Sequence, residues 1–120
     1  MSAAAFQRAS ERFGAVATHR DTEYNAFARV TRLLSQADPT GHGPAAKTAV
    51  HLNTELWSTL AADLAHEGNQ LPDALKASLI SLAIFSIRHG LRVAAKEASI
   101  QPLIDVNMSM MRGLRGEVNP

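Results

Sequence analysis

Cysteine is absent from this 120-residue chain. Its absence excludes disulfides, thiolate zinc sites and a cysteine nucleophile, and it fits a protein that works in a reducing compartment. Aromatic residues make up only 5% of the chain and charged residues 19%, with a formal net charge of +1. A chain this close to neutral has little bulk charge to attract a polyanion, so nucleic acid is a disfavoured partner.

Targeting and membrane-spanning patterns are also missing. The residues from Met1 to Phe13 contain no apolar run and carry Arg8 and Arg12, unlike the apolar core of a secretory signal. The longest apolar run, Leu79 to Ile87, is much shorter than the roughly 20 apolar residues of a spanning helix. We therefore expect a cytoplasmic protein without a membrane span.

Helix is the regular element that the sequence predicts. Alanine and leucine, both strong helix formers, are frequent, and no stretch alternates between apolar and polar side chains as a strand does. The apolar periodicity predicts five helices, with Ser99 capping the last: Ala3 to Phe13, Thr22 to Leu34, Pro44 to Glu67, Pro72 to Ala98 and Ile100 to Arg112.

The overall architecture follows from the long third and fourth helices. They are joined by only about four residues, which makes them antiparallel neighbours. We expect an all-α, single-domain bundle of about five helices around this long antiparallel hairpin. The domain is expected to cover residues 1–116, with residues 117–120 as a free C-terminal tail.

Two asparagines interrupt the apolar faces of the predicted helices. Asn53 lies in the middle of the third-helix stripe that contains Trp57, and Asn107 lies near the centre of the last helix's apolar arc. A buried asparagine that finds a hydrogen-bond partner in a neighbouring helix is one interpretation. A direct role in binding a partner is the other.

The fourth and fifth helices have more apolar surface than one packed face requires. Their apolar arcs are about twice the roughly 100° that a helix at the edge of a small domain needs. Methionines gather on the last helix, and methionine adapts to irregular partners, although it also fills cores. The sequence thus offers a candidate partner-binding surface: Met108, Met110, Met111, Leu114, Ile80 and Ile84.

No constellation of catalytic or metal-binding residues is visible. His51 and Glu55 offer only two ligands on one helix, whereas zinc takes three or four protein ligands. We expect no enzymatic activity, no metal and no cofactor. Five cations lie near two helix ends: Arg88, Arg92, Lys96, Arg112 and Arg115. Contact with RNA phosphates is one interpretation of this set, and stabilisation of the helix dipole is the other.

From about Tyr24 to Gly116 the chain resembles the FlaF family of bacterial flagellar biosynthesis regulators. Three motifs in the family's order carry the resemblance: Asn53-Thr54-Glu55-Leu56-Trp57, Asn69-Gln70-Leu71-Pro72 and Leu103-Ile104-Asp105-Val106-Asn107. The resemblance implies a small cytoplasmic helical protein that binds flagellin as a secretion chaperone and promotes its synthesis and export. It also implies a functional link to FlbT, which acts on flagellin translation, and it brings no catalytic residues.

Two alternatives stay open beside flagellin binding. One is a translational regulator that contacts RNA through the five cations. The other is a structural helical module that forms homo-oligomers through its surplus apolar arc. Flagellin binding has its own physical rationale, because amphipathic helices dock into apolar grooves and flagellin's ends are such helices.

Overall fold

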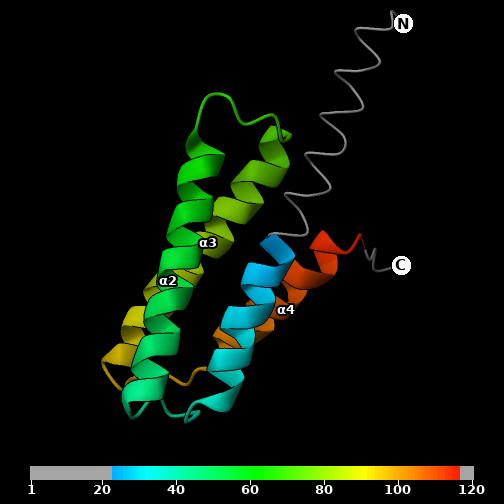
Figure 1. Cartoon of the computed structure of the whole chain (residues 1–120). Helices are drawn as coiled ribbons and strands as arrows, with labels where there is room; N and C mark the ends of the chain where they lie inside the picture. The colour runs from blue at the N-terminus through cyan, green and yellow to red at the C-terminus, as the bar shows by residue number, and fades with distance from the viewer. Residues whose placement is uncertain (1–22, 117–120) are drawn as a thin grey trace, which may run out of the picture.

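The structure, a computed structural model, describes residues 23–116 of the chain. These residues form four helices and no strand: residues 23–36, α2 (Pro44–Ala65), α3 (Asp73–Ala94) and α4 (Gln101–Leu114) (Figure 1). The all-helical prediction is confirmed for this part of the chain. The predicted helix from Ala3 to Phe13 lies outside the described residues, as does the predicted tail at 117–120, so the expected five helices reduce to four here.

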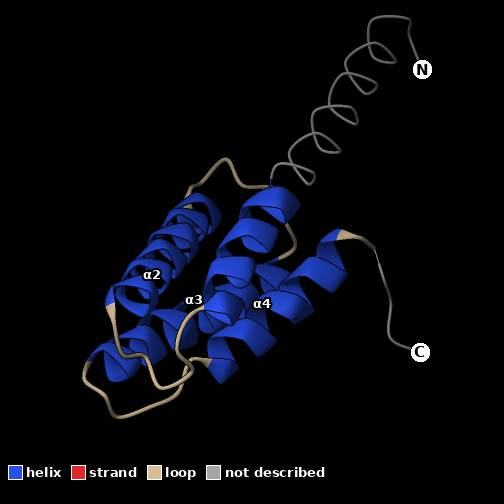
Figure 2. Cartoon of the chain, turned by 60° about the horizontal axis from the view of Figure 1, so that its bottom comes forward, coloured by secondary structure: helices blue, strands red, loops and turns tan. Residues whose placement is uncertain are grey.

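The four helices are arranged in two layers. Residues 23–36 and α2 lie side by side, with α3 packed along α2 and α4 behind residues 23–36 (Figures 1 and 2). The α2–α3 pair is the predicted antiparallel hairpin. The helix α2 begins at Pro44 as predicted, and α3 begins at Asp73, one residue after the predicted start at Pro72.

Both hairpin helices end earlier than predicted. The helix α2 stops at Ala65 rather than Glu67, because His66 adopts an extended backbone at φ −69° and ψ 137°. The helix α3 stops at Ala94 rather than Ala98, because Lys96 adopts a left-handed φ of 64°. This turn lets the Glu97 N–H bond back to the Arg92 carbonyl at 2.8 Å, which closes the helix end in the manner of a Schellman motif.

The start of α4 also differs from the prediction. Ile100 occupies the N-cap position, and no side chain caps the helix. Ser99, expected as the cap, instead uses its backbone carbonyl, which lies 2.8 Å from His89 Nε2. A second hydrogen bond links the start of α4 to the loop before α2, because the Pro39 carbonyl accepts the Ile100 N–H at 3.0 Å.

Small residues bring α3 close to α2. Ala83, Ser86 and Gly90 are buried along one strip of α3. A Cβ at Gly90 would lie 3.1 Å from Thr54 Oγ1 and 3.4 Å from Val50 Cγ1, so the helices approach closely at this point. A larger side chain at Gly90 would push the helices apart.

Two apolar clusters form the core of the described residues. The first joins the 23–36 helix, the start of α2, the end of α3 and the start of α4: Val30, Leu34, Ala37, Ala46, Ala49, Val50, Val93, Ile100 and Leu103. The second surrounds the indole at the middle of α2: Phe27, Trp57, Leu60, Leu64 and Ala83. Trp57 has no exposed surface, which confirms the burial that its stripe predicts.

By length and composition alone, α3 is the one helix within residues 23–116 that is long and apolar enough to cross a membrane. Helices packed inside water-soluble proteins satisfy the same criterion.

Candidate partner-binding surface

A buried chain of polar side chains fixes α4 against α2. The Trp57 indole Nε1 donates to Asn107 Oδ1 at 2.9 Å, and Asn107 Nδ2 donates to Asn53 Oδ1 at 2.8 Å. Both asparagines have no exposed surface. Each is therefore the buried, hydrogen-bonded asparagine that the sequence predicts, although the Asn53 Nδ2 group has no partner within the described residues.

Phe27 extends this contact to the 23–36 helix. Its ring meets the Trp57 indole edge to face, with the centroids 5.2 Å apart and the planes at 74°. Such aromatic pairs add to the stabilisation from simple area burial. The indole thus joins three helices, and the two hydrogen bonds set which side of α4 faces inward.

With α4 held in this rotation, most of the predicted partner surface covers the core. Met110, Met111, Leu114 and Ile80 are half-buried and pack against the Trp57 cluster. The other two predicted residues are open to solvent, Met108 at 41% and Ile84 at 45% exposed. The apolar arc of α4 is therefore largely used within the fold.

The exposed residues of the predicted surface lie on different sides of the molecule. On α3, Gly90 faces α2, and His89 reaches the loop that precedes α4. Ile84 lies about 140° around the helix from His89, on the side away from α4. Ile84 and the α4 methionines therefore do not form one continuous patch.

One side of α3 carries an apolar row of which the sequence analysis named only Ile80 and Ile84 as partner-binding residues. It consists of Ile80, Ile84, Ile87, Leu91 and Ala94, which we term the outer stripe. Leu91 is the most exposed large apolar side chain in the described residues, at 67%. The regular spacing of four and three residues was the signal available in the sequence.

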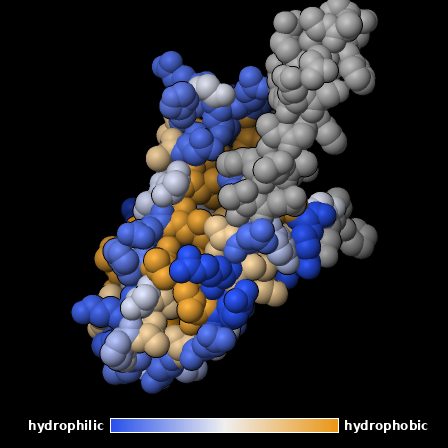
Figure 3. Space-filling model, in the orientation of Figure 1, coloured by the Kyte–Doolittle hydropathy of each residue, from blue (hydrophilic) through white to orange (hydrophobic). Residues whose placement is uncertain are grey.

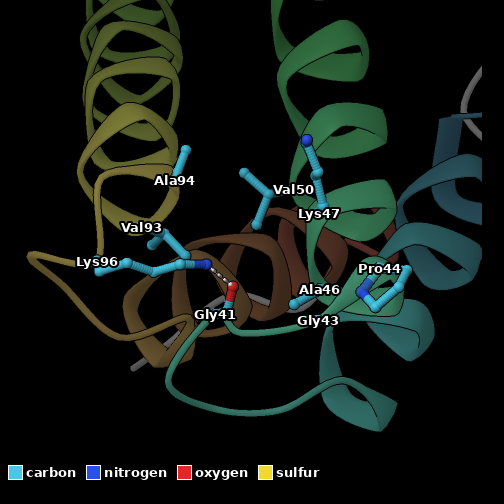
Figure 4. A pocket seen from close by; sticks show the side chains of 9 residues that line it. All are labelled: Gly41, Gly43, Pro44, Ala46, Lys47, Val50, Val93, Ala94 and Lys96. Atoms are coloured by element: carbon cyan, nitrogen blue, oxygen red, sulfur yellow. Dashed lines mark hydrogen bonds between the residues drawn. The ribbon is translucent and has the colours of Figure 1, made fainter.

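The outer stripe ends at a hollow between α2 and α3. This hollow has a volume of about 560 Å³ and is lined mostly by small apolar side chains, including Val50, Val93 and Ala94 (Figure 4). Lys47 stands on its α2 wall. At its base, Lys96 Nζ donates to the Gly41 carbonyl at 2.8 Å, which ties the loop to the end of α3.

Another face of the molecule lies between residues 23–36 and α2. Apolar residues gather there in a band with strongly hydrophilic residues beside them (Figure 3). The leucines that pack against the core at this seam are half-buried: Leu33, Leu52 and Leu56. A hollow of about 300 Å³ lies at its lower end, lined in part by Leu33, Pro44 and Ala49.

The five cations of the RNA alternative are not equally available. Lys96 is bound to Gly41, Arg112 donates to Ser109 Oγ at 2.9 Å, and Arg115 lies 5.6 Å from the centre of the Tyr24 ring. Arg88 and Arg92 are exposed on α3, and within residues 23–116 neither side chain makes a hydrogen bond or an ion pair. Arg88 lies about 40° around α3 from Ile84, beside the outer stripe, and Arg92 lies about 80° from it on the same flank.

The remaining motif residues have local structural roles. Asn69 Oδ1 accepts the Leu71 N–H at 3.1 Å, and the Asn69 carbonyl accepts Lys76 Nζ at 2.6 Å, which organises the turn ahead of Pro72. Asp105 accepts a hydrogen bond from Gln101 one turn earlier in α4, at 2.9 Å.

His51 and Glu55 form an exposed pair rather than part of a larger ligand set. Their side chains meet at 3.0 Å across one turn of α2. Within the part of the chain that the structure describes, no group of three metal-ligating side chains is present.

Comparison with models of protein families assigns the chain to a family. The family model described as flagellar protein FlaF matches residues 2–114. The chain belongs to the FlaF family. No curated protein and no solved structure matches it. Within this FlaF-family chain, the motif residues Asn53, Trp57 and Asn107 form the buried network just described.

Proposed function

We propose that this FlaF-family chain binds flagellin in the cytoplasm and promotes its synthesis and export as a secretion chaperone. Membership in a family of flagellar proteins supports the flagellar part of this proposal. The chemistry that supports binding is the exposed apolar surface on α3 and α4. Binding alone accounts for the proposed role, so no catalytic step, metal or cofactor is part of it.

One observation carries the proposal, namely the set of large apolar side chains that the fold leaves uncovered. Three of them, Ile84, Phe85 and Leu91, lie within two turns of α3, and Met108 lies on α4. Exposed apolar patches on small domains mark sites of interaction. Flagellin's amphipathic end helices have the complementary apolar faces, and covering these faces would prevent premature polymerisation.

Titration of monomeric flagellin into the full chain tests the proposal directly. We expect a complex detectable by calorimetry and by size-exclusion chromatography, together with delayed filament growth when the chain is in excess. Because the contacts are mainly apolar, binding should persist at salt concentrations that screen exposed charges. Absence of a complex at micromolar concentrations of both proteins would rule out the proposal.

The same measurement separates the two alternatives. An RNA-contacting regulator would bind flagellin transcript with an affinity that falls steeply with salt. A homo-oligomeric module would show a mass that rises with its own concentration, with no flagellin present. The functional link to FlbT stays part of the proposal and would appear as a change in flagellin translation when both proteins are present.

A further inference from the structure

We infer that the outer stripe of α3 is the docking groove for an amphipathic helix of flagellin, and that this helix carries acidic side chains beside its apolar seam. The inference rests on the proposed function and adds to it the surface and the chemistry of the segment that is recognised. It assigns the main contact to α3 and removes it from the methionine-rich α4.

The spacing of the outer stripe matches what a partner helix requires. Its members follow one another at intervals of four, three, four and three residues, from Ile80 to Ala94. This is the spacing of apolar side chains along a coiled-coil seam, where the side chains of one helix insert between those of the other. The stripe extends over two heptads, so it suits a partner helix of about four turns.

Exposure along the outer stripe shows that the fold does not fill this seam. Ile84, in the middle of α3, is 45% exposed, and Leu91, in its last turn, is 67% exposed, although both side chains are aliphatic. Ile80 and Ile87, which alternate with Ile84 and Leu91 in the row, are half-buried. The row therefore packs against the core along one edge and is exposed to solvent along the other.

The hollow at the end of the outer stripe gives the groove a concave terminus. Ala94 ends the stripe and also lines the 560 Å³ hollow, opposite Val50 of α2 (Figure 4). A space of this size accepts a large apolar side chain from a docked helix. An anchor residue in such a pocket supplies much of the binding energy of a helix in a groove.

The positive charge beside the outer stripe favours a partner helix that carries acidic side chains next to its apolar face. Arg88 and Arg92 stand one turn apart along the same flank, and within residues 23–116 no acidic side chain pairs with either. Lys47 is exposed near the hollow at the stripe's end. These cations surround the C-terminal half of the groove, so acidic residues on the docked helix would be attracted there and would fix its register.

An anionic membrane surface is the rival occupant, because apolar side chains and arginines also combine in interfacial helices. Two features favour a helix over lipid. The outer stripe ends in a hollow, whereas a flat lipid surface makes no use of a concave pocket, and the exposed Phe85 lies off the stripe on the far side of Arg88.

The test compares serine variants of the full chain in flagellin titrations. Ile84→Ser and Leu91→Ser should each weaken binding about tenfold, a loss of about 1.4 kcal/mol. Leu75→Ser is the matched control, because Leu75 is also 45% exposed and lies on α3, about 180° around the helix from Ile84. Leu75→Ser should bind flagellin like the parent, and Met108→Ser should weaken binding less than Leu91→Ser does.

The outcomes separate this inference from the proposed function. If the parent binds flagellin and the two stripe variants bind it equally well, the outer stripe is not the docking groove, whereas the proposed function is supported. If the parent does not bind flagellin, both the proposed function and this inference are overturned. If Met108→Ser weakens binding and Leu91→Ser does not, α4 is the site and the inference is overturned.

Two further arms test the charge and the lipid rival. Arg88→Gln with Arg92→Gln should weaken flagellin binding several-fold at low salt, and the difference from the parent should shrink as salt rises. If the double arginine variant binds flagellin as tightly as the parent at low salt, the inference that the docked helix carries acidic side chains is overturned. Vesicles containing phosphatidylglycerol should not bind the parent; binding that Leu91→Ser abolishes, with flagellin binding intact, would assign the stripe to lipid instead.

Discussion

Trp57 donates its indole N–H to Asn107 Oδ1 at 2.9 Å, linking two fully buried side chains that lie fifty residues apart in the chain. Asn107 also donates to Asn53, so one amide joins two partners on α2. A buried polar group that loses its partner costs free energy, so this arrangement penalises any rotation or slippage of α4. The apolar cluster around the indole supplies the affinity between these helices, and the amide supplies their register.

Replacing Asn107 with alanine should destabilise the fold strongly. It leaves the Trp57 N–H and the Asn53 Oδ1 without partners in a buried site, at about 1–3 kcal/mol for each group. We expect a loss of about 2–6 kcal/mol in the free energy of unfolding. Urea melts followed by the fluorescence of Trp57, the one tryptophan in the chain, give this value directly.

The double variant Asn53→Ala with Asn107→Ala controls for the loss of each side chain alone. Since the two amides are bonded to each other, their effects should be non-additive by about 0.5–3 kcal/mol. Effects that add within the error of the melts would mean that the amides act independently, contrary to the network.

Helical periodicity was sufficient to predict the buried positions but not their partners. The stripe that contains Trp57 and Asn53 repeats every three to four residues, so local sequence carries the information about burial. The pairing of Trp57 with Asn107 depends on how α4 crosses α2, which no local pattern records. The sequence therefore predicted that Asn53 and Asn107 have partners, without identifying them.

The candidate surface was harder to predict for a related reason. The apolar arcs of α3 and α4 are wider than one face, so periodicity alone did not show which edge remains uncovered. In the structure, Met110 and Met111 of α4 pack against the core, whereas Leu91 of α3 is exposed to solvent. The early end of α3 was missed because Lys96, a residue that rarely adopts positive φ, forms the left-handed turn where glycine is usual.

Gly41 and Gly43 form a matched pair that tests the contact between the loop and α3. Both adopt positive φ, at 83° and 91°, so an alanine strains the backbone at either position by roughly 1 kcal/mol. A Cβ at Gly41 would also lie 2.5 Å from Val93 Cγ1, whereas one at Gly43 meets nothing within 4 Å. We expect Gly41→Ala to be the more destabilising of the two by at least about 1 kcal/mol in thermal or urea melts.

Shortening the opposing side chain provides the control for this comparison. Adding Val93→Ala to Gly41→Ala removes the Cγ1 atom that the new Cβ would meet. The double variant should therefore be more stable than the sum of the two single effects predicts. Equal losses for the two glycine variants would show that the loop moves away from α3 at no cost.

The Asp38 carboxylate gives the loop a measurable pH dependence. It accepts hydrogen bonds from the Thr40 hydroxyl at 2.6 Å and from the Thr40 N–H at 2.8 Å, and these hold its pKa below the usual 3.8. Because the pKa is lower in the folded state, the charged carboxylate stabilises the fold above the unfolded-state pKa. That contribution is lost as pH falls through the folded-state value.

Carbon-detected NMR titration of Asp38 should give a pKa below 3.8 in the parent and a higher value in Thr40→Ala, which removes the strongest of these hydrogen bonds. The stability difference between the parent and Asp38→Ala should be largest near neutral pH and shrink in acid. A parent pKa at or above 3.8 would show that Thr40 does not hold the carboxylate in solution.

The three methionines of α4 should differ in their effect on stability, and this difference distinguishes a core role from a partner role. Met110 and Met111 are half-buried against the Trp57 cluster, whereas Met108 is 41% exposed. Serine at Met110 or Met111 should cost about 1–2 kcal/mol, less than the 2–5 kcal/mol typical of truncating a fully buried methionine. Met108→Ser should change stability by no more than about 0.5 kcal/mol. Urea melts of the three variants measure these costs, and flagellin titrations at a temperature where all three are folded measure binding. If Met110→Ser and Met111→Ser unfold like the parent and yet lose flagellin, their side chains serve the partner rather than the core.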